Sequence, residues 1–356
     1  MTARMHVFVG AGGVGKTTLA AGYALALART GAKVALLGID PARRLQGALG
    51  ITLGDLAVPV AGAAGVDAAL LRPEDSLRRW AAEALPDGVT RERLLANPFF
   101  LALADRLAGA TDIFAAVRLV EWAERDPTRT DFVVDTAPGL NAIEFLRRPQ
   151  TLSAFLEGRL VGWLRWLAGQ QASGNDHPGS LGMGAQRVLG GLRRLTGARM
   201  VLELAEFVWL VERVFANMLV RLAKAQAWLK SDATRVLLVT AVRDDAAASV
   251  TSMTDALGAV GIAPHAIVVN RAVPDGLGAE LAAIDPATLS AGGAMLVTYA
   301  RAYAAMQARV LAGVAGQAPA ILRVPALRGL AEAGRVDTLM ALGDRLLRLQ
   351  AAADAS

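Results

Sequence analysis

Near its start the chain reads Gly10-Ala11-Gly12-Gly13-Val14-Gly15-Lys16-Thr17, which fits the pattern G-x-x-x-x-G-K-T. An apolar run, His6–Gly10, precedes this stretch, and a helical pattern, Thr17–Arg29, follows it. Glycines between a strand and a helix let backbone N–H groups turn towards a phosphate, and the helix N-terminus adds the positive end of its dipole. The stretch therefore predicts a phosphate-binding loop in an α/β fold.

The residues of this loop have predicted roles in binding ATP and Mg²⁺. Lys16 is expected to neutralise the β- and γ-phosphate oxygens, the Thr17 hydroxyl to bind Mg²⁺, and Thr18 to lie close to the α-phosphate. The backbone groups that surround the phosphates are expected from Gly12, Gly13, Val14 and Gly15. The alternative is a glycine-rich turn with an incidental lysine, which the flanking strand and helix disfavour.

Two further predicted strands lead to a carboxylate. The run Lys33–Gly38 is followed by Asp40, which is placed to orient a water molecule on the γ-phosphate, although a helix cap or a loop carboxylate would have the same sequence pattern. The run Asp131–Asp135 ends in an acid of the Walker-B type, which reaches Mg²⁺ through its water shell, although Asp can also simply end a strand. The catalytic candidates are Asp40 and Lys16, and the metal candidates are Thr17, Asp40 and Asp135.

A later predicted strand, His265–Asn270, ends in an amide. An Asn side chain can both accept a hydrogen bond from an adenine edge and donate one to it, so Asn270 is a candidate nucleotide-binding residue. Asn is also an ordinary turn residue, and that second interpretation stays open.

The other strand signals alternate with helical patterns. Further strand signals lie at Arg235–Ala241 and Ile321–Val324, and most of the predicted strands are continuous apolar runs, which is typical of parallel strands covered on both faces. Strand–helix alternation predicts a doubly wound, mostly parallel α/β sheet. Two long helical stretches interrupt it and indicate an inserted helical subdomain. We expect a P-loop nucleotide-binding domain formed by residues 1–72, 126–150 and 231–356, and a helical subdomain formed by residues 73–125 and 151–230.

Composition narrows the classes of function. The chain has 356 residues, 54% of them hydrophobic, but no stretch of about 18 residues is apolar and free of charge, as a membrane-spanning helix requires. No signal-peptide pattern opens the sequence, so we expect a cytoplasmic protein. The absence of cysteine excludes disulfides, thiolate metal sites and iron–sulfur chemistry of the nitrogenase-reductase kind. The net charge of +5 comes from arginines mixed with acids, so we expect no nucleic-acid partner.

Together these motifs resemble an ATPase family that includes the arsenite-pump ATPase and the targeting factor for tail-anchored membrane proteins. The resemblance covers nearly the whole chain and rests on Val9–Thr18, Asp40-Pro41-Ala42, Asp135-Thr136-Ala137-Pro138, Asn270 and Val324-Pro325. It implies a nucleotide-dependent dimer in which Asp40 belongs to switch I and supports hydrolysis, while Asp135 opens switch II. The blocks Asn141–Leu146 and Phe155–Arg159 look closest to a bacterial branch of the family.

The chain departs from the family pattern in three respects. The family's loop carries a signature lysine that reaches the partner's nucleotide across the dimer, and here Ala11 stands at that position. Switch II usually continues Thr-Gly-His after its proline, whereas Gly139-Leu140-Asn141 follow Pro138 here. The cysteines that bind zinc or arsenite in some relatives are absent, which argues against metalloid transport.

We therefore expect an Mg²⁺-ATP-hydrolysing switch protein that acts as a homodimer or in a hetero-complex with a paralogous ATPase. The resemblance implies a hydrophobic or membrane-associated protein client, with peripheral membrane association, although the apolar helical faces could equally pack against each other. One alternative, suggested by Ala11, is a regulatory nucleotide-binding subunit that hydrolyses little ATP and pairs with a lysine-bearing paralogue. A second is a partitioning or positioning ATPase, in which the amphipathic stretch Asp337–Gln350 would contact a membrane rather than pack on the sheet.

A candidate client-binding face lies at Leu160–Leu167, where Trp163 and Trp166 share one side of a predicted helix. The glycine-rich, polar stretch Gly169–Gly184 could act as a lid. Three methionines could add an adaptable apolar lining: Met183, Met200 and Met218. The alternative is that both tryptophans belong to the core of the subdomain.

Overall fold

The computed structural model describes residues 3–39, 44–101, 111–139, 198–274, 276–326 and 336–355. The chain divides into two compact units. The first consists of Met1–Leu71, Arg118–Arg147 and Gln226–Ser356, and the second of Arg72–Val117 and Arg148–Ala225.

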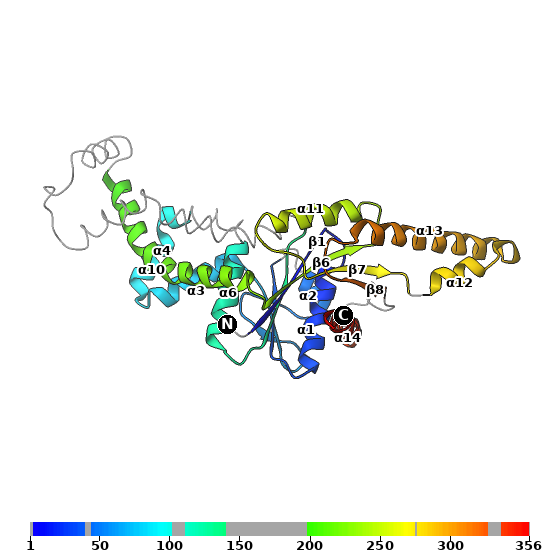
Figure 1. Ribbon diagram of the computed structural model, residues 1–356. Helices are drawn as coiled ribbons and strands as arrows, with labels where there is room; N and C mark the ends of the chain where they lie inside the picture. The colour runs from blue at the N-terminus through cyan, green and yellow to red at the C-terminus, as the bar shows by residue number, and fades with distance from the viewer. Residues whose placement is uncertain are drawn as a thin grey trace. The chain divides into compact units, whose positions relative to one another are not determined.

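A sheet with the strand order β3-β4-β2-β5-β1-β6-β7-β8 forms the centre of the first unit (Figure 1). Its strands are β1 (Arg4–Gly10), β2 (Val34–Gly38), β3 (Val58–Pro59), β4 (Val66–Leu70), β5 (Asp131–Asp135), β6 (Thr234–Ala241), β7 (Ala266–Ala272) and β8 (Ile321–Pro325). All neighbouring strands of this sheet run parallel except β3 and β4, which are antiparallel. The predicted mostly parallel α/β sheet is confirmed.

Helices cover both faces of this sheet. Helices α1 (Lys16–Arg29) and α14 (Val336–Asp354) lie on one face, and α11 (Ala246–Gly258) lies on the other (Figure 1). The central strands β1, β2 and β5 are buried along almost their whole length, as expected for strands covered from two sides. The same unit also contains α2 (Arg44–Leu49), α12 (Leu277–Ala283), a short 3-10 turn (Pro286–Thr288) and α13 (Ala291–Val314).

Sequence analysis missed several of these elements, above all β4 and α13. Strand β4 is short and reads Val-Asp-Ala-Ala-Leu, with few of the β-branched and aromatic residues that mark strands. It is nevertheless buried beside β2, and its polar residue Asp67 pairs with Arg129 at 2.5 Å. Helix α13 is rich in Ala and Gly and carries few charges, so its sequence shows little polar periodicity.

Helices α1 and α14 pack so closely that their backbones touch. A Cβ atom on Gly343 would lie 1.9 Å from the carbonyl oxygen of Gly22, and one on Gly22 would lie 2.5 Å from the carbonyl oxygen of Leu339. Glycine at both positions is therefore required by the close approach. Because α1 is buried on every side from Leu19 to Leu27, α14 encloses it against the sheet.

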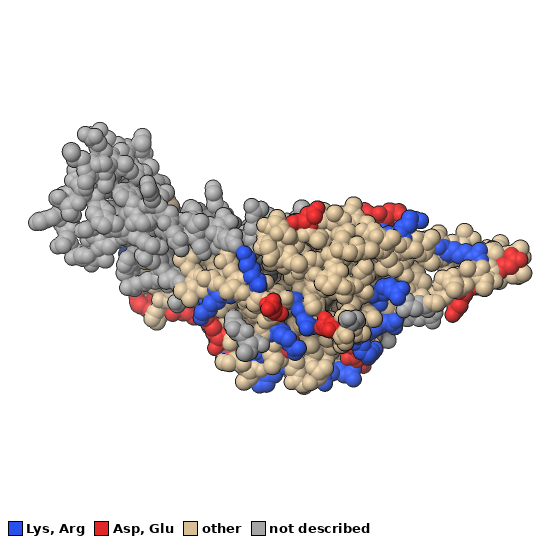
Figure 2. Space-filling view, viewed as in Figure 1, with Lys and Arg blue, Asp and Glu red and all other residues tan. Residues whose placement is uncertain are grey.

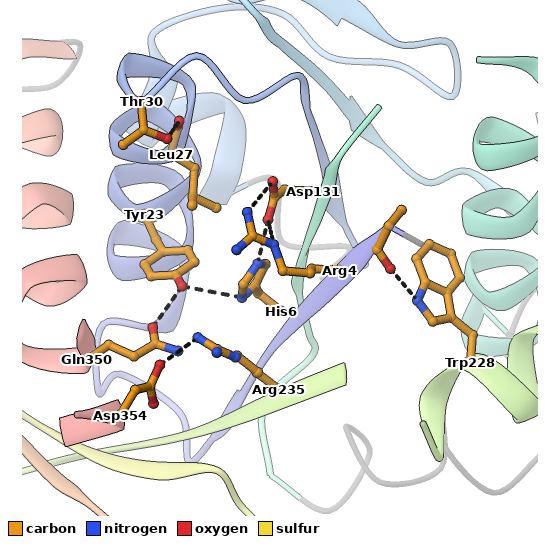
Figure 3. A network of polar contacts seen from close by, with 11 residues as sticks. Arg4, His6, Tyr23, Leu27, Thr30, Asp131, Trp228, Arg235, Gln350 and Asp354 are labelled. Atoms are coloured by element: carbon orange, nitrogen blue, oxygen red, sulfur yellow. Dashed lines mark hydrogen bonds and ion pairs between the residues drawn. The ribbon is translucent and has the colours of Figure 1, made fainter. Parts of the chain in front are cut away.

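A buried polar network ties these two helices to the amino-terminal ends of β1 and β5 (Figure 3). The Tyr23 hydroxyl donates to Gln350 Oε1 at 2.7 Å and lies 3.3 Å from His6 Nδ1. The other ring nitrogen of His6 lies 2.9 Å from Asp131 Oδ1, which Arg4 also contacts at 3.0 Å. These contacts join β1, β5, α1 and α14 at the end of the sheet away from the glycine-rich loop.

Burial sets the charge state of the network. It lowers the pKa of His6, although the neighbouring carboxylate acts in the opposite direction. Burial alone would raise the pKa of Asp131, but its hydrogen bond and charge interaction with His6 outweigh this, and the pKa is lowered. Burial therefore favours the neutral form of His6, and the contacts of Asp131 favour its ionised form.

The second unit is helical in its described part, with α3 (Pro73–Ala84), α4 (Gly88–Ala96), the start of α6 (Thr111–Arg125) and most of α10 (Ala198–Leu229). Trp80 and Phe114 stack with ring centroids 5.0 Å apart, and the buried side chain of Asn97 donates to the Glu203 carbonyl at 3.0 Å. The unit boundary falls inside α6, whereas the sequence prediction placed all of α6 in the helical subdomain. From Arg118 onward α6 belongs to the first unit, in which the buried Arg118 side chain forms an ion pair with Asp55.

Several predicted features of the client-binding face lie outside the described residues. They are Leu160–Leu167 with both tryptophans, the stretch Gly169–Gly184, and Met183. Met200 belongs to α10, and Met218 of the same helix is buried. The apolar side chain of Met218 therefore contributes to a packed interior.

None of the helices in the described part of the chain combines the length and the apolar character that crossing a bilayer requires. On the face shown in Figure 2, basic and acidic side chains of the described residues are interspersed. Such mixing differs from the continuous basic stripe that a nucleic-acid backbone attracts.

Candidate phosphate-binding site

The glycine-rich loop leaves the sheet from its central strand, β1, which lies between β5 and β6. At the end of β1, Gly10 pairs with Val239 of β6, and a Cβ on Gly10 would lie 2.2 Å from the Val239 carbonyl oxygen. Only glycine fits at this close approach. The loop is thus positioned at the carboxyl edge of a parallel sheet, where α/β proteins bind their ligands.

The loop's backbone is shaped for an anion. Gly13 and Gly15 have φ values of 75° and 95°, in the left-handed region that favours glycine. Gly15 is the N-cap of α1, no side chain caps the helix there, and its first turn contains no acidic residue. The N–H groups at a helix start have no partner within the helix, and the helix dipole favours negative charge in front of them. The site therefore suits a phosphate group.

Lys16 places a positive charge on the loop itself. Its side chain is 5% exposed, and Nζ donates to the carbonyl oxygens of Gly10 and Ala11, each at 2.9 Å. Thr17 and Thr18, in the same helical turn, are half-buried. The structure thus gathers the predicted residues Gly12–Thr18 in one loop and the first turn of one helix.

The segment that follows β5 lies against this loop. Asp135, buried at the carboxyl end of β5, is in register with Phe8 of β1. The N–H of Gly139 donates to the Gly10 carbonyl at 2.9 Å, and the Thr136 hydroxyl donates to the Phe8 carbonyl at 2.7 Å. The predicted switch II start is therefore brought to the phosphate loop.

The oxygen donors at this edge suit a small, hard cation such as Mg²⁺. Over the described ranges no three His, Asp or Glu side chains gather into a metal-binding group. A Mg²⁺ ion here would therefore depend on the Thr17 hydroxyl, on Asp135 and on the phosphates of a nucleotide. Asp40, the third predicted metal candidate, lies outside the described residues, directly after Ile39, whose N–H donates to the Asp135 carbonyl at 2.9 Å.

Asn270 makes a contact that sequence analysis did not predict. Its Nδ2 donates to the Val14 carbonyl of the loop at 2.8 Å, and its Oδ1 accepts from the N–H of Arg271 at 2.9 Å. A Cβ on Gly15 would lie 2.3 Å from the same Nδ2. Asn270 therefore braces the phosphate loop from β7, while the predicted contact with adenine stays a prediction.

The backbone next to Asn270 is strained. Among the described residues other than glycine, only Arg271 has a positive φ, 56°, and the pairing of β7 with β8 is irregular at the same point. The Tyr303 hydroxyl donates to the Arg271 carbonyl at 2.9 Å and so supports this conformation. Strain of this kind costs on the order of 1–3 kcal/mol and is found preferentially at functional sites.

Arg243, which follows β6, is a further residue at this site that the sequence alone does not indicate. Its Nη1 lies 3.5 Å from the Gly12 carbonyl oxygen, and its guanidinium is paired with Asp245. No motif marks an arginine at this position, because its place beside the loop depends on the pairing of β6 with β1.

Comparison with known proteins gives one family model and several relatives that each match less than half of the chain. A family model described as anion-transporting ATPase matches residues 3–172. The chain is 31% identical over 160 residues to an arsenical pump-driving ATPase of Escherichia coli, an alignment that covers 44% of this chain and 27% of that protein. It is 33% identical over 153 residues to ATPase GET3 of Malassezia globosa, covering 41% of this chain and 43% of that protein.

A third relative, ATPase GET3 of Kluyveromyces lactis, is 30% identical over 181 residues, covering 46% of this chain and 52% of that protein. The chain therefore spans between about a quarter and about half of the length of these relatives. The matched part includes the phosphate loop and the strand that ends in Asp135.

Proposed function

We propose that the protein binds Mg²⁺-ATP at the Gly10–Thr17 loop and hydrolyses it, since residues 3–172 match the anion-transporting ATPase family model. The observation that carries the proposal is the loop itself: an uncapped helix start, two glycines in left-handed conformations, and the Lys16 ammonium on the loop carbonyls. The relatives that support it are described as ATPases.

The residues of this site have separate roles in phosphoryl transfer. The loop N–H groups and Lys16 bind the phosphates, and Thr17 and Asp135 would hold Mg²⁺. Asp40 orients the attacking water, whose oxygen bonds to the γ-phosphorus while the bond to the β–γ bridging oxygen breaks. Bound Mg²⁺ supplies positive charge to the phosphate oxygens.

We further propose that hydrolysis drives rearrangement of a dimer or of the helical subdomain, and that the client is a hydrophobic or membrane-associated protein. Support comes from relatives described as a pump-driving ATPase and as GET3, and from the helical unit inserted between β4 and β6. The competing candidate is a regulatory subunit with little hydrolysis, for which Ala11 is the specific observation.

The first test measures Mg²⁺-ATP binding by calorimetry and turnover by phosphate release. Lys16→Ala is expected to weaken binding at least about 100-fold, because a buried phosphate charge loses its nearest cation. Asp40→Asn is expected to bind ATP like the unchanged protein and to lose hydrolysis. Lys33→Ala is the matched control, since this exposed lysine contacts Thr128 at 3.0 Å rather than the loop.

Unchanged ATP affinity in the Lys16 variant would refute the site. Normal binding without turnover in the unchanged protein would favour the regulatory subunit, which mixing with a lysine-bearing paralogue would then test.

A further inference from the structure

Arg243 brings a second positive charge to the phosphate loop from the end of the neighbouring strand. Arg243 follows the end of β6 at Ala241, and β6 pairs with β1 as far as Gly10. Its Nη1 donates to the carbonyl oxygen of Gly12 at 3.5 Å. The Lys16 ammonium contacts the carbonyls of the two preceding loop residues. Two cations from different elements thus reach three consecutive carbonyl groups of one loop.

Asp245 fixes the orientation of this arginine. Its carboxylate binds the guanidinium along one side, with Oδ1 accepting from Nε and Oδ2 accepting from Nη2 at 2.7 Å. A guanidinium is a rigid planar fork, so a carboxylate on its Nε–Nη2 side leaves Nη1 directed elsewhere. In this structure Nη1 is directed at the loop.

The Arg243–Asp245 pair lies at the start of α11 but does not cap that helix. Asp245 is the N-cap residue of α11, and Asp is among the residues preferred there because its side chain accepts from the helix's first N–H groups. Here the side chain makes no such capping hydrogen bond. Exposed ion pairs contribute little to stability, so an Asp taken from its cap to hold an arginine indicates a role other than stability.

We propose that Arg243 is a catalytic residue, the cation in cis that stabilises negative charge on the γ-phosphoryl group as it passes to water. This inference rests on the proposed ATPase function. In that step the bond from the γ-phosphorus to the bridging oxygen of ADP breaks, the water oxygen bonds to phosphorus, and the water proton leaves to solvent. A guanidinium stays charged throughout and matches the geometry of phosphate oxygens.

The loop itself carries a single cation. Lys16 is the only charged residue in Gly10–Thr17, and the residue before Gly12 is Ala11. The Arg243 side chain is 45% exposed, so its Nη1 can reach a phosphate on the loop without disturbing the core. Because Asp245 lies two residues away on the same segment, the guanidinium is held close to the loop before a nucleotide arrives.

The test compares Arg243→Ala, Arg243→Lys and the unchanged full chain. We expect Arg243→Ala to lower kcat about 10-fold or more, which is below the roughly 10³–10⁵-fold that arginine cations can contribute to phosphoryl transfer, because the group is partly exposed. The Kd for Mg²⁺-ATP is expected to change less than about threefold, and Arg243→Lys to recover part of kcat. The matched control is Arg309→Ala, an arginine that is 69% exposed and lies 4.0 Å from Asp244.

A second measurement does not depend on turnover. Calorimetry compares the Kd of Mg²⁺-ADP alone with its Kd in the presence of aluminium fluoride, which mimics the transferring phosphoryl group. In the Arg243→Ala variant, the increase in Mg²⁺-ADP affinity that aluminium fluoride causes is expected to be about tenfold smaller. The Kd for Mg²⁺-ADP alone is expected to stay unchanged. Unchanged kcat and unchanged fluoride enhancement would overturn the proposal, as would an equal loss of affinity for ATP, ADP and the mimic. Either result would leave the Lys16 test, and with it the ATP site, intact.

Discussion

Gly343→Ala tests the backbone contact between α1 and α14. The added Cβ would lie 1.9 Å from the Gly22 carbonyl oxygen and 2.9 Å from the Ala26 Cβ, so the two helices must separate by about 1.3 Å to reach an ordinary contact distance. This movement would loosen the buried side chains Leu342 and Leu346 of α14. The perturbation is therefore an overpacked helix pair with a defined displacement.

The magnitude follows from two opposing effects. Overpacking costs typically about 1–3 kcal/mol, and a contact against backbone on a flat helix pair belongs at the upper end. Replacing glycine by alanine inside a helix contributes about 0.5–1 kcal/mol in the other direction. We expect a net fall of about 2 kcal/mol in the free energy of unfolding. For a domain of this size that corresponds to a fall of about 4–8 °C in Tm.

Urea denaturation measures the free energy, and hydrogen exchange localises the effect, because amides of α1 and α14 should exchange faster than those of β6 and β7. Gly258→Ala in α11 is the matched control, since a Cβ there meets nothing within 4 Å and should leave stability unchanged or slightly higher. If Gly343→Ala is as stable as Gly258→Ala, the two helices do not pack backbone to backbone.

Two further predictions concern buried polar residues. The folded state lowers the pKa of His6 from 6.5, so the unfolded chain takes up a proton first as the pH falls. The urea concentration at the midpoint of unfolding should therefore drop between pH 7.5 and pH 5.5. The His6→Gln variant should lose most of that drop. The lowered pKa of Asp131 acts in the same direction at lower pH, so a midpoint that rises on acidification would contradict the assignment. Asn270→Ala leaves the Val14 carbonyl without its donor, and we expect the Kd for Mg²⁺-ATP to rise about 10-fold. An equal loss for Mg²⁺-GTP would indicate a role in the loop alone, whereas loss of ATP preference would indicate that the amide also contacts adenine.

The local sequence predicted those parts of the fold whose signal is local. The strands β1, β2, β5 and β6 are continuous apolar runs, and the loop Gly10–Thr17 is a motif whose spacing follows from the geometry of phosphate binding. Strand β4 was not predicted, because its short, alanine-rich sequence shows no strand preference. Burial beside β2 nevertheless makes it a strand.

Contacts between distant parts of the chain could not be predicted in the same way. Asn270 and Val14 are separated by 256 positions, and the separation between Arg243 and Gly12 is 231. Their contacts exist because β6 and β7 follow β1 in the sheet. A motif shows which residues can do chemistry, but only the strand order shows which side chains reach the motif.

The central position of β1 has a consequence for how the chain is made. Its neighbour β5 lies more than a hundred residues later in the sequence, and Met5 pairs with Thr234 of β6. At about 5–20 residues per second, roughly 10–50 seconds of synthesis separate β1 from its second neighbour. During that time an apolar strand and the following helix have no complete sheet to join, and parallel pairings of high contact order form slowly. The segment carrying the phosphate loop is thus synthesised early but gains its neighbouring strands late. A nascent chain stalled before β6 should therefore bind chaperones and lack affinity for ATP.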